Sequence, residues 1–304
     1  GLPLWRRALK QPATVKKVVQ MSSSYGIGWT WNLIEGRILA GSPTGYSAAG
    51  EVTEVGDGIQ DIVAGDRVAC GGAQCAYHAE IIRVPRNLVV PIPEALDWPA
   101  ASTVTLGAIA LQGVRRAHPM LGETFVVLGL GILGQLTVQI LKANGCRVIG
   151  TDLSRERIVL AESLGVDAGV HSDDGTDFEQ VARLTDGIGA DGVIITAASP
   201  SDAVVSTAFK MCRKKGRVVL VGDVGLHLDR ADFYQKEIDF FISCSYGPGR
   251  YDRTYEEKGL DYPVAFVRWT ENRNMAEYLR LLAEGKVRVQ PLVSVTCPIE
   301  QAPA

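Results

Sequence analysis

The chain has 304 residues, of which 46% are hydrophobic and 21% are charged, and its formal net charge is −3. This composition is typical of a globular protein with a sizeable core, and the length fits one large domain or two ordinary ones. So small a net charge provides no overall positive field, which argues against nucleic acid or an anionic membrane as the main partner. Six widely spaced cysteines, and apolar stretches that are all short or interrupted, predict a cytoplasmic protein that spans no membrane.

The first third of the chain predicts a helical start and then a β-rich region. Residues 1–40 contain two short amphipathic patterns with basic faces, which we interpret as solvated helix faces rather than a membrane or phosphate surface. Between residues 42 and 93, short β-branched runs such as 50–56 and 66–69 are separated by Gly and Pro. Closely spaced short strands of this kind predict a small barrel-like domain.

From about residue 123 the pattern changes to strands that alternate with helices. The predicted strands cover 125–128, 147–151, 192–196 and 217–221, and a further strand ends near residue 243. The predicted helices cover 133–143, 155–164, 178–184 and 202–211. Alternation with short connections predicts an α/β fold with a doubly wound parallel sheet.

A glycine-rich loop at the first of these strands predicts a dinucleotide site. Its residues are Gly129, Leu130, Gly131, Ile132, Leu133 and Gly134. The loop follows an apolar strand and opens a helix, the context in which a GxGxxG pattern is specific. We expect Gly129 to form the tight turn, Gly131 to admit a pyrophosphate, and Gly134 to let helix and strand pack closely. The helix N-terminus then offers free N–H groups to the phosphates.

The residues after the second strand bear on which dinucleotide binds. Asp152 stands where a carboxylate accepts hydrogen bonds from the ribose hydroxyls of NAD and repels the 2′-phosphate of NADP. Leu153 and Arg157 are expected beside the same ribose. Arg155 and Arg157 could instead accommodate NADP, so the sequence favours NAD and leaves NADP open.

Loops at the carboxyl ends of the other strands should line the same crevice, since ligands of doubly wound sheets bind there. The expected contacts are Thr196, Ala197, Ala198, Val221, Gly222, Asp223 and Ser245.

A β-rich domain before a Rossmann unit resembles the medium-chain dehydrogenase/reductase superfamily, whose first domain is a GroES-like barrel. Residues 45–68 are similar to the segment in which zinc alcohol dehydrogenases carry a metal-binding His and a following Glu. Here Tyr46 and Ser47 stand at those two positions, and the four-cysteine lobe for structural zinc has no counterpart. Cys70, Cys75 and His78 could supply three ligands, but their spacing is not that of known zinc sites. We therefore expect no metal.

A closer resemblance is to the first half of bi-domain oxidoreductases from bacterial polysaccharide and glycoconjugate gene clusters, whose first half is a zinc-free medium-chain dehydrogenase. It covers nearly the whole chain and rests on the following segments: 45–47, 105–113, 221–225, 233–237, 245–252, 255–263 and 267–275. The first barrel strands of the family have no counterpart, so the barrel is expected to be incomplete. The chain ends where the second half would begin, which fits either a fragment or a stand-alone relative.

This resemblance implies two domains and a set of site residues. The GroES-like catalytic domain would cover 1–104, with 288–304 returning to it, and the Rossmann domain 105–287. Tyr46, at the metal-ligand position, would face the nicotinamide and could exchange a proton if a nearby cation lowers its pKa. Thr105, at the domain junction, would support the nicotinamide or its ribose, and Asp223 and His227 are alternative proton-transfer groups.

The segment 246–268 is dense in aromatic and cationic side chains, which can stack on a sugar ring and bind its hydroxyls or a phosphate. The expected further catalytic groups are Tyr246 and Lys258, and the expected substrate contacts are Arg250, Tyr251, Tyr255 and Arg268. A long loop inside a compact domain is uncommon unless it is functional or disordered, which favours a substrate loop.

Together these features predict a NAD-dependent, zinc-independent oxidoreductase of a sugar, a nucleotide-sugar or another polyhydroxylated small molecule. By analogy with the superfamily we expect a homodimer formed through the sixth strand. One alternative is an NADPH-dependent quinone or enone reductase. Another is a non-catalytic NAD-binding subunit.

Overall fold

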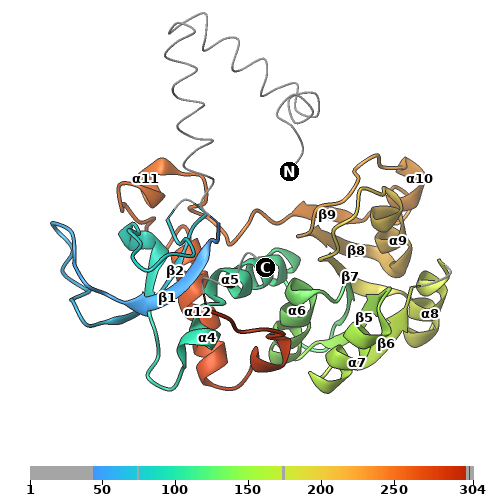
Figure 1. Cartoon of the computed structure of the whole chain (residues 1–304). Coiled ribbons are helices and arrows are strands. Elements are labelled where there is room, and N and C mark those ends of the chain that lie inside the picture. Colours follow the sequence, from blue (N-terminus) through green and yellow to red (C-terminus); the bar gives the residue numbers. More distant parts are fainter. Residues whose placement is uncertain (1–43, 74, 173–174, 299–300, 302–304) are drawn as a thin grey trace, which may run out of the picture. The chain divides into compact units, whose positions relative to one another are not determined.

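The computed structural model describes residues 44–73, 75–172, 175–298 and 301, and Gly45–Ala304 form one compact unit (Figure 1). The two amphipathic patterns expected within residues 1–40 lie outside the described residues.

The larger sheet is parallel and has six strands. They are β4 (Thr124–Leu128), β5 (Arg147–Asp152), β6 (Ala168–His171), β7 (Ala190–Ile195), β8 (Cys212–Leu220) and β9 (Asp239–Ile242). Their order in space is β6-β5-β4-β7-β8-β9, and all neighbours run parallel. This is the doubly wound order in which the chain starts at the middle strand and reverses direction after the third. The α/β fold predicted from the sequence is confirmed.

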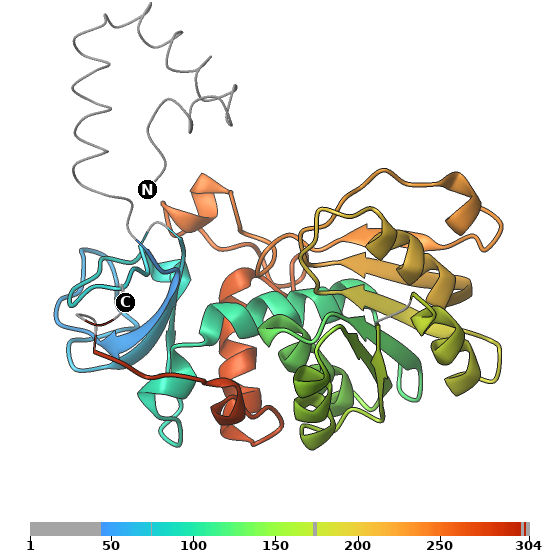
Figure 2. The same ribbon diagram turned by 45° about the vertical axis from the view of Figure 1, so that its right-hand side comes forward.

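Helices cover both faces of this sheet (Figure 2). They are α6 (Ile132–Ala143), α7 (Arg155–Ser163), α8 (Asp177–Leu184), α9 (Ala203–Met211) and α10 (Arg230–Phe233). Successive residues of β4 belong to two different cores, because side chains alternate along a strand. Phe125 and Val127 pack in one core with Leu136 of α6, whereas Val126 packs in the other with Phe209 of α9.

The smaller sheet is antiparallel and consists of β1 (Ser47–Glu51), β2 (Arg67–Gly71) and β3 (Val89–Pro91), with the short 3₁₀ turn η1 (Arg86–Leu88) before β3. Only the first two residues of the predicted run 50–56 belong to β1. Val52 follows the strand and forms backbone hydrogen bonds with Asp66 and Gly65. Three strands are compatible with an incomplete GroES-like barrel.

Two long helices that were not predicted from the sequence lie beside the smaller sheet and pack against each other. Helix α5 (Val104–Ala117) packs on α6, on α12 (Glu271–Ala283) and on strands of both sheets. The remaining short elements are α4 (Trp98–Ala101), α11 (Arg253–Glu256) and η2 (Gln290–Leu292). The expected domain boundary at residues 104/105 coincides with the start of α5. None of the described helices is both long and apolar enough to cross a bilayer.

Candidate cofactor and active site

The loop between β4 and α6 has the geometry of a phosphate-binding turn. Gly129 adopts φ +96°, and a Cβ atom there would lie 2.7 Å from the backbone nitrogen of Ala197. A Cβ atom on Gly134 would lie 1.9 Å from the carbonyl oxygen of Gly129, so helix and strand can pack only because this residue is glycine. Above Gly131, by contrast, a Cβ would meet no described atom within 4 Å. The space that a pyrophosphate needs is therefore open at the middle glycine.

The α6 N-terminus faces this space without a side-chain cap. Gly131 is its N-cap residue and supplies no side chain, and Ile132 is partly exposed. The first N–H groups of a helix have no partner inside the helix, and they carry the positive end of the helix dipole. Backbone groups at Ile132 and Leu133 can therefore bind an anion.

Asp152 ends β5 and holds the loop in place. Its Oδ2 accepts a hydrogen bond of 2.6 Å from the N–H of Leu130, and its Oδ1 accepts one of 2.8 Å from the N–H of Ser154. The side chain is 6% exposed, and Arg157 approaches it to 3.6 Å. A carboxylate oxygen can accept more than one hydrogen bond, so these contacts leave acceptor capacity for ribose hydroxyls. Leu153, next in the chain, is largely exposed and could pack on a ligand.

The carboxyl ends of β4, β7 and β8 meet beside the loop. The hydroxyl of Thr196 donates a hydrogen bond of 2.5 Å to the carbonyl of Gly129. A Cβ atom on Gly222 would lie 1.9 Å from the carbonyl oxygen of Ala197, so the segments after β7 and β8 are in close contact. Ala198 and Asp223 are exposed at this edge, while Val221 and Ser245 are partly buried. The structure thus brings together the glycine loop and the expected residues after β7 and β8.

Tyr46 stands at the start of β1 with its side chain 42% exposed. Its carbonyl oxygen accepts hydrogen bonds from the hydroxyl of Thr105 at 3.0 Å and from the N–H of Gly72 at 3.0 Å. Ser47 accepts a bond from the N–H of Thr105 and donates one to the carbonyl of Ser102. These bonds fix the backbone of Tyr46 and leave its phenol accessible. The fully buried hydroxyl of Thr105 is used in holding that backbone.

The residues near Tyr46 do not fit the zinc site implied by the superfamily. In the part of the chain that the structure describes, no group of three His, Cys, Asp or Glu side chains could hold a metal. The buried thiol of Cys75 lies 3.5 Å from the carbonyl oxygen of Gly71, to which it donates. The exposed His78 ring lies against the backbone of Gly45. We therefore derive no chemical step through a metal.

The segment after β9 is largely folded into the protein. Tyr246 and Tyr255 are almost fully buried, and the ring of Tyr255 stacks on Tyr262 with a centroid distance of 5.2 Å. The guanidinium of Arg250 donates a hydrogen bond of 2.5 Å to Glu256. Burial and nearby carboxylates, chiefly Glu271, raise the pKa of Tyr246 far above its usual range. Tyr246 and Tyr255 therefore contribute to the packing of this segment in the structure.

The sequence analysis missed the carboxyl group of Glu271. This first residue of α12 is fully buried, and neither carboxylate oxygen has a hydrogen-bond partner among the described residues. Burial, together with the charge of Glu256, raises its pKa to about 8, although Arg250 acts in the opposite direction. Nothing in the local sequence marks such a position, because its burial depends on how the preceding segment folds.

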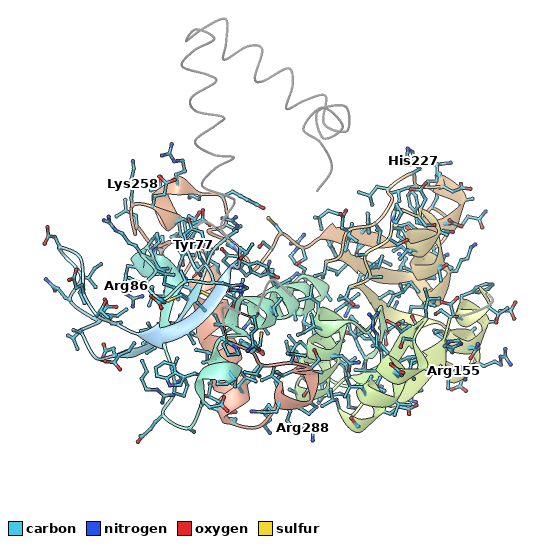
Figure 3. All side chains as sticks on the ribbon, viewed as in Figure 1. Tyr77, Arg86, Arg155, His227, Lys258 and Arg288 are labelled. Carbon is cyan, nitrogen blue, oxygen red and sulfur yellow. The ribbon has the colours of Figure 1, made fainter. Side chains whose placement is uncertain are left out.

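The other expected substrate residues are dispersed. Lys258 and Tyr251 are exposed, and Lys258 lies near α11, well apart from His227 beside α10 (Figure 3). His227 pairs with Asp202 at 3.1 Å. Arg268 stacks on Trp269 and lines a separate cavity.

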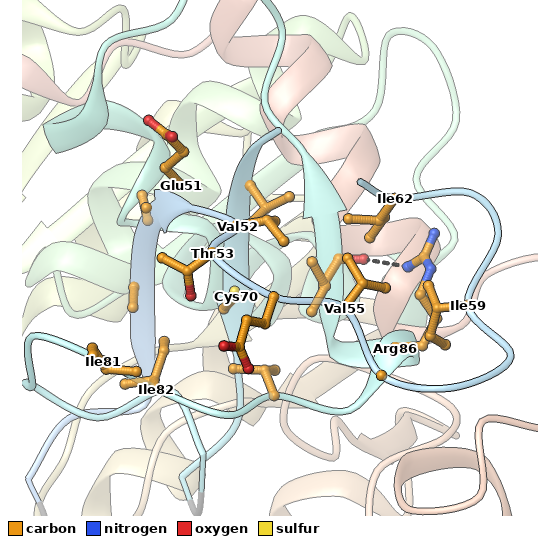
Figure 4. A pocket seen from close by; sticks show the side chains of 18 of the residues that line it. Glu51, Val52, Thr53, Val55, Ile59, Ile62, Cys70, Ile81, Ile82 and Arg86 are labelled. Carbon is orange, nitrogen blue, oxygen red and sulfur yellow. Dashed lines mark hydrogen bonds between the residues drawn. The ribbon is translucent and has the colours of Figure 1, made fainter. Parts of the chain in front are cut away.

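A hollow of about 250 Å³ lies along the smaller sheet (Figure 4). Aliphatic side chains such as Val52, Ile59 and Ile62 surround it. Its one arginine, Arg86, is engaged by Asp61 and by the carbonyl of Val89. Glu51, Thr53, Glu54 and Glu80 also line the hollow, and none of the residues expected from the sequence to bind cofactor or substrate does.

Comparison with known proteins agrees with this fold. Residues 133–260 match the family described as zinc-binding dehydrogenase. An alcohol dehydrogenase of Rhizobium meliloti (strain 1021) is 30% identical over 273 residues, which cover 80% of this chain and 79% of that protein.

Solved structures are similar over most of the described chain. Alcohol dehydrogenase TADH from Thermus sp. ATN1 superimposes with a TM-score of 0.69 at 22% identity, covering 85% of this chain and 80% of its own. Galactitol-1-phosphate dehydrogenase from Escherichia coli gives a TM-score of 0.66 at 21% identity, covering 80% and 74%. Relatives of this kind imply a nicotinamide cofactor and a small-molecule substrate. The chain belongs to the zinc-binding dehydrogenase family of the medium-chain dehydrogenase/reductase superfamily, and it is an NAD(P)-dependent oxidoreductase.

Proposed function

We propose that the chain is a NAD-dependent, zinc-independent dehydrogenase of a sugar, a nucleotide-sugar or another polyhydroxylated small molecule. The observation that carries the proposal is the accessible phenol of Tyr46, whose backbone carbonyl accepts a hydrogen bond from Thr105. By the resemblance to the superfamily, Tyr46 stands where zinc enzymes have a metal ligand. A bound nicotinamide supplies or accepts the hydride.

The choice of NAD rests on Asp152. Its carboxylate is fixed by two backbone N–H groups at the carboxyl end of β5, where the adenosine ribose of a dinucleotide binds. A fixed negative charge attracts the two hydroxyls and repels a 2′-phosphate. Arg157, whose exposed side chain lies 3.6 Å from the carboxylate, partly offsets this charge. The phosphates would lie over Gly131 and the N-terminus of α6.

Proton exchange is assigned to Tyr46. A dehydrogenase without a metal needs a side chain that holds the alcohol proton as the hydride leaves. The phenol of Tyr46 is an accessible acid beside β1, and the bonds from Thr105 and Gly72 keep its backbone in one position. Of the further expected groups, Lys258 and Tyr251 are exposed and can reach a polar substrate.

The sugar-like substrate is supported by the resemblance to the bi-domain oxidoreductases and by a structural relative that is named for a sugar-alcohol phosphate. The domain division at 104/105, with 288–304 returning to the first domain, also belongs to this proposal. So does a homodimer formed through β9, because β9 is an edge strand of the parallel sheet.

The test is steady-state turnover of the purified chain with NAD and NADP on a panel of polyols, sugars and nucleotide-sugars. Replacing Tyr46 by Phe is expected to lower kcat by about 100-fold or more, because general acid–base catalysis contributes that much, while the dissociation constant of NADH stays unchanged. Tyr234→Phe, at a largely exposed tyrosine beside α10, is the matched control and should retain full activity.

Full turnover by Tyr46→Phe would remove the proton-transfer assignment. Activity confined to NADPH and enones would replace the proposal by a reductase, and tight NAD binding without any turnover would indicate a binding subunit. Loss of activity on chelation, with recovery on adding zinc, would contradict zinc independence.

A further inference from the structure

A cavity of about 590 Å³ lies between helices α5, α6 and α12 and the segments around Pro248 and Trp269. It is separate from the cofactor crevice. The cavity meets α6 at its last residues, Ile140 to Asn144, whereas the glycine loop lies at its first. Since α6 has 12 residues, these two ends are about 18 Å apart.

The lining of this cavity is strongly basic. It contains four arginines, Arg115, Arg116, Arg268 and Arg280, and one acidic residue, Glu277. Two of the arginines already have partners. Arg280 pairs with Glu277 and Glu284, and Arg116 donates a hydrogen bond to the carbonyl of Ile242. Among the described residues, Arg115, Arg116 and Arg268 form no ion pair. Arg116 lies over the ring of Phe241, whereas Arg115 and Arg268 share the ring of Trp269.

These two arginines are held against one aromatic ring. The guanidinium carbon of Arg115 lies 3.3 Å from the centroid of Trp269, and that of Arg268 lies 3.8 Å from it. Arg115 also donates a hydrogen bond of 2.9 Å to Asn274, whose own amide is fixed by Gln112 and the carbonyl of Tyr246. Two like charges are thus kept close together by neutral groups.

The electrostatics of Arg115 reflect this arrangement. Burial lowers its pKa to about 10, the charge of Arg268 acts in the same direction, and Glu277 only partly opposes them. Basic side chains near a helix C-terminus are common because they complement the helix dipole. That explanation covers Arg115, near the end of α5, but not Arg268, which lies outside any helix.

We propose that this cavity is a second ligand site, in which Arg115 and Arg268 together bind the oxyanion of a small phosphate ester or carboxylate beside Trp269. A guanidinium presents a planar fork of donors that matches both anions. The cavity volume lies within the range of small-molecule sites. An anion bound by both guanidinium groups would balance the positive charge that Glu277 offsets only in part. This assigns Arg268 to a site other than the substrate site expected from the sequence.

The test is calorimetric titration of the protein saturated with NADH, at constant ionic strength, with inorganic phosphate in one arm and malonate in the other. NADH occupies the glycine loop, so that the α6 N-terminus does not compete for the probe. We expect millimolar or tighter binding of at least one probe, and the probe that binds identifies the source as phosphate ester or carboxylate. Arg268→Gln should weaken it about tenfold or more, and Arg268→Lys less, because lysine keeps the charge and loses the fork.

Arg183→Gln, at an exposed arginine of α8, is the matched control and should bind as the unaltered protein does. Arg268 is exposed, so its replacement should leave the melting temperature unchanged, and Arg115→Gln provides a second variant. The proposal fails if neither probe binds below about 10 mM, a free energy of only about 3 kcal/mol. It also fails if both arginine variants bind like the unaltered protein, or if NADH abolishes binding. None of these outcomes depends on the substrate or on turnover.

Discussion

At the scale of single residues, Asp152 joins two tasks. Its carboxylate accepts N–H bonds from Leu130 and Ser154, which positions the glycine loop, and we propose that it also binds the ribose. The sequence could predict this residue because an acidic side chain at the end of the second strand is part of the GxGxxG pattern. It could not predict that Arg157 lies 3.6 Å away, since that distance depends on the side-chain arrangement in the first turn of α7.

Replacing Asp152 by Asn should therefore change cofactor preference more than fold. The amide oxygen can keep one of the two backbone N–H bonds and the other is lost, while the neutral side chain no longer repels a 2′-phosphate. We expect kcat/KM with NAD to fall about tenfold, a change of about 1.4 kcal/mol. The ratio of kcat/KM with NAD to kcat/KM with NADP should fall by at least the same factor. Asp186→Asn, at an exposed turn with φ +52°, serves as control. An unchanged ratio would show that Asp152 does not select the cofactor.

At the scale of elements, α12 shows what local patterns can and cannot reveal. Strands and helices of the parallel sheet were predicted to within a few residues, because their apolar periodicity and turn residues are strong. The short strand β6 and the helices α5 and α12 were missed. Residues 168–171 form only one short strand, and no helix was predicted from the residues of α12, which follow the expected substrate loop 246–268. Its first residue, Glu271, is buried only because the segment from Tyr246 to Asp252 folds over it.

The buried carboxyl of Glu271 should make stability depend on pH. Its pKa is about 8 in the folded chain, against 4.5 for an unperturbed glutamate. Between these values the folded chain keeps a proton that the unfolded chain releases, so the free energy of unfolding falls as pH rises. Glu271→Gln is uncharged at every pH and should remove this decline, with a gain on the order of a few kcal/mol at pH 8.5.

Urea unfolding at pH 5 and pH 8.5 measures this difference. Glu284→Gln, at the other end of α12, is the control, and its decline with pH should match that of the unaltered chain. If the Glu271 variant declines equally, the carboxyl is not held protonated by its surroundings.

At the scale of the whole molecule, β9 is the strand through which we propose that two copies pair, and it is one of the two edge strands of the parallel sheet, with β6 at the other edge. An edge strand exposes unpaired backbone groups that can pair with a second copy about a two-fold axis. Ile242, its last residue, is 54% exposed, although it is apolar. The sequence suggested this interface only through the superfamily resemblance, since an edge position is a property of the assembled sheet.

Ile242→Lys is therefore expected to shift the chain from dimer to monomer, because two like charges would meet near the axis. Light scattering coupled to size-exclusion chromatography measures the mass directly. Leu226→Lys, at another exposed apolar residue outside the sheet, should leave the mass unchanged. A monomeric unaltered chain, or a dimer that persists in the Ile242 variant, would contradict an interface through β9.

The three glycines of the phosphate loop have an evolutionary consequence. Gly129 and Gly134 face backbone at 2.7 and 1.9 Å, so a side chain at either position is incompatible with the fold. Above Gly131 there is only open space, and its φ of −64° suits any residue. A duplicated gene could therefore lose cofactor binding by one substitution there and still encode a well-folded protein. A single substitution at Gly131 would thus give a folded but inactive protein, whereas a single substitution at Gly129 or Gly134 would disrupt the fold.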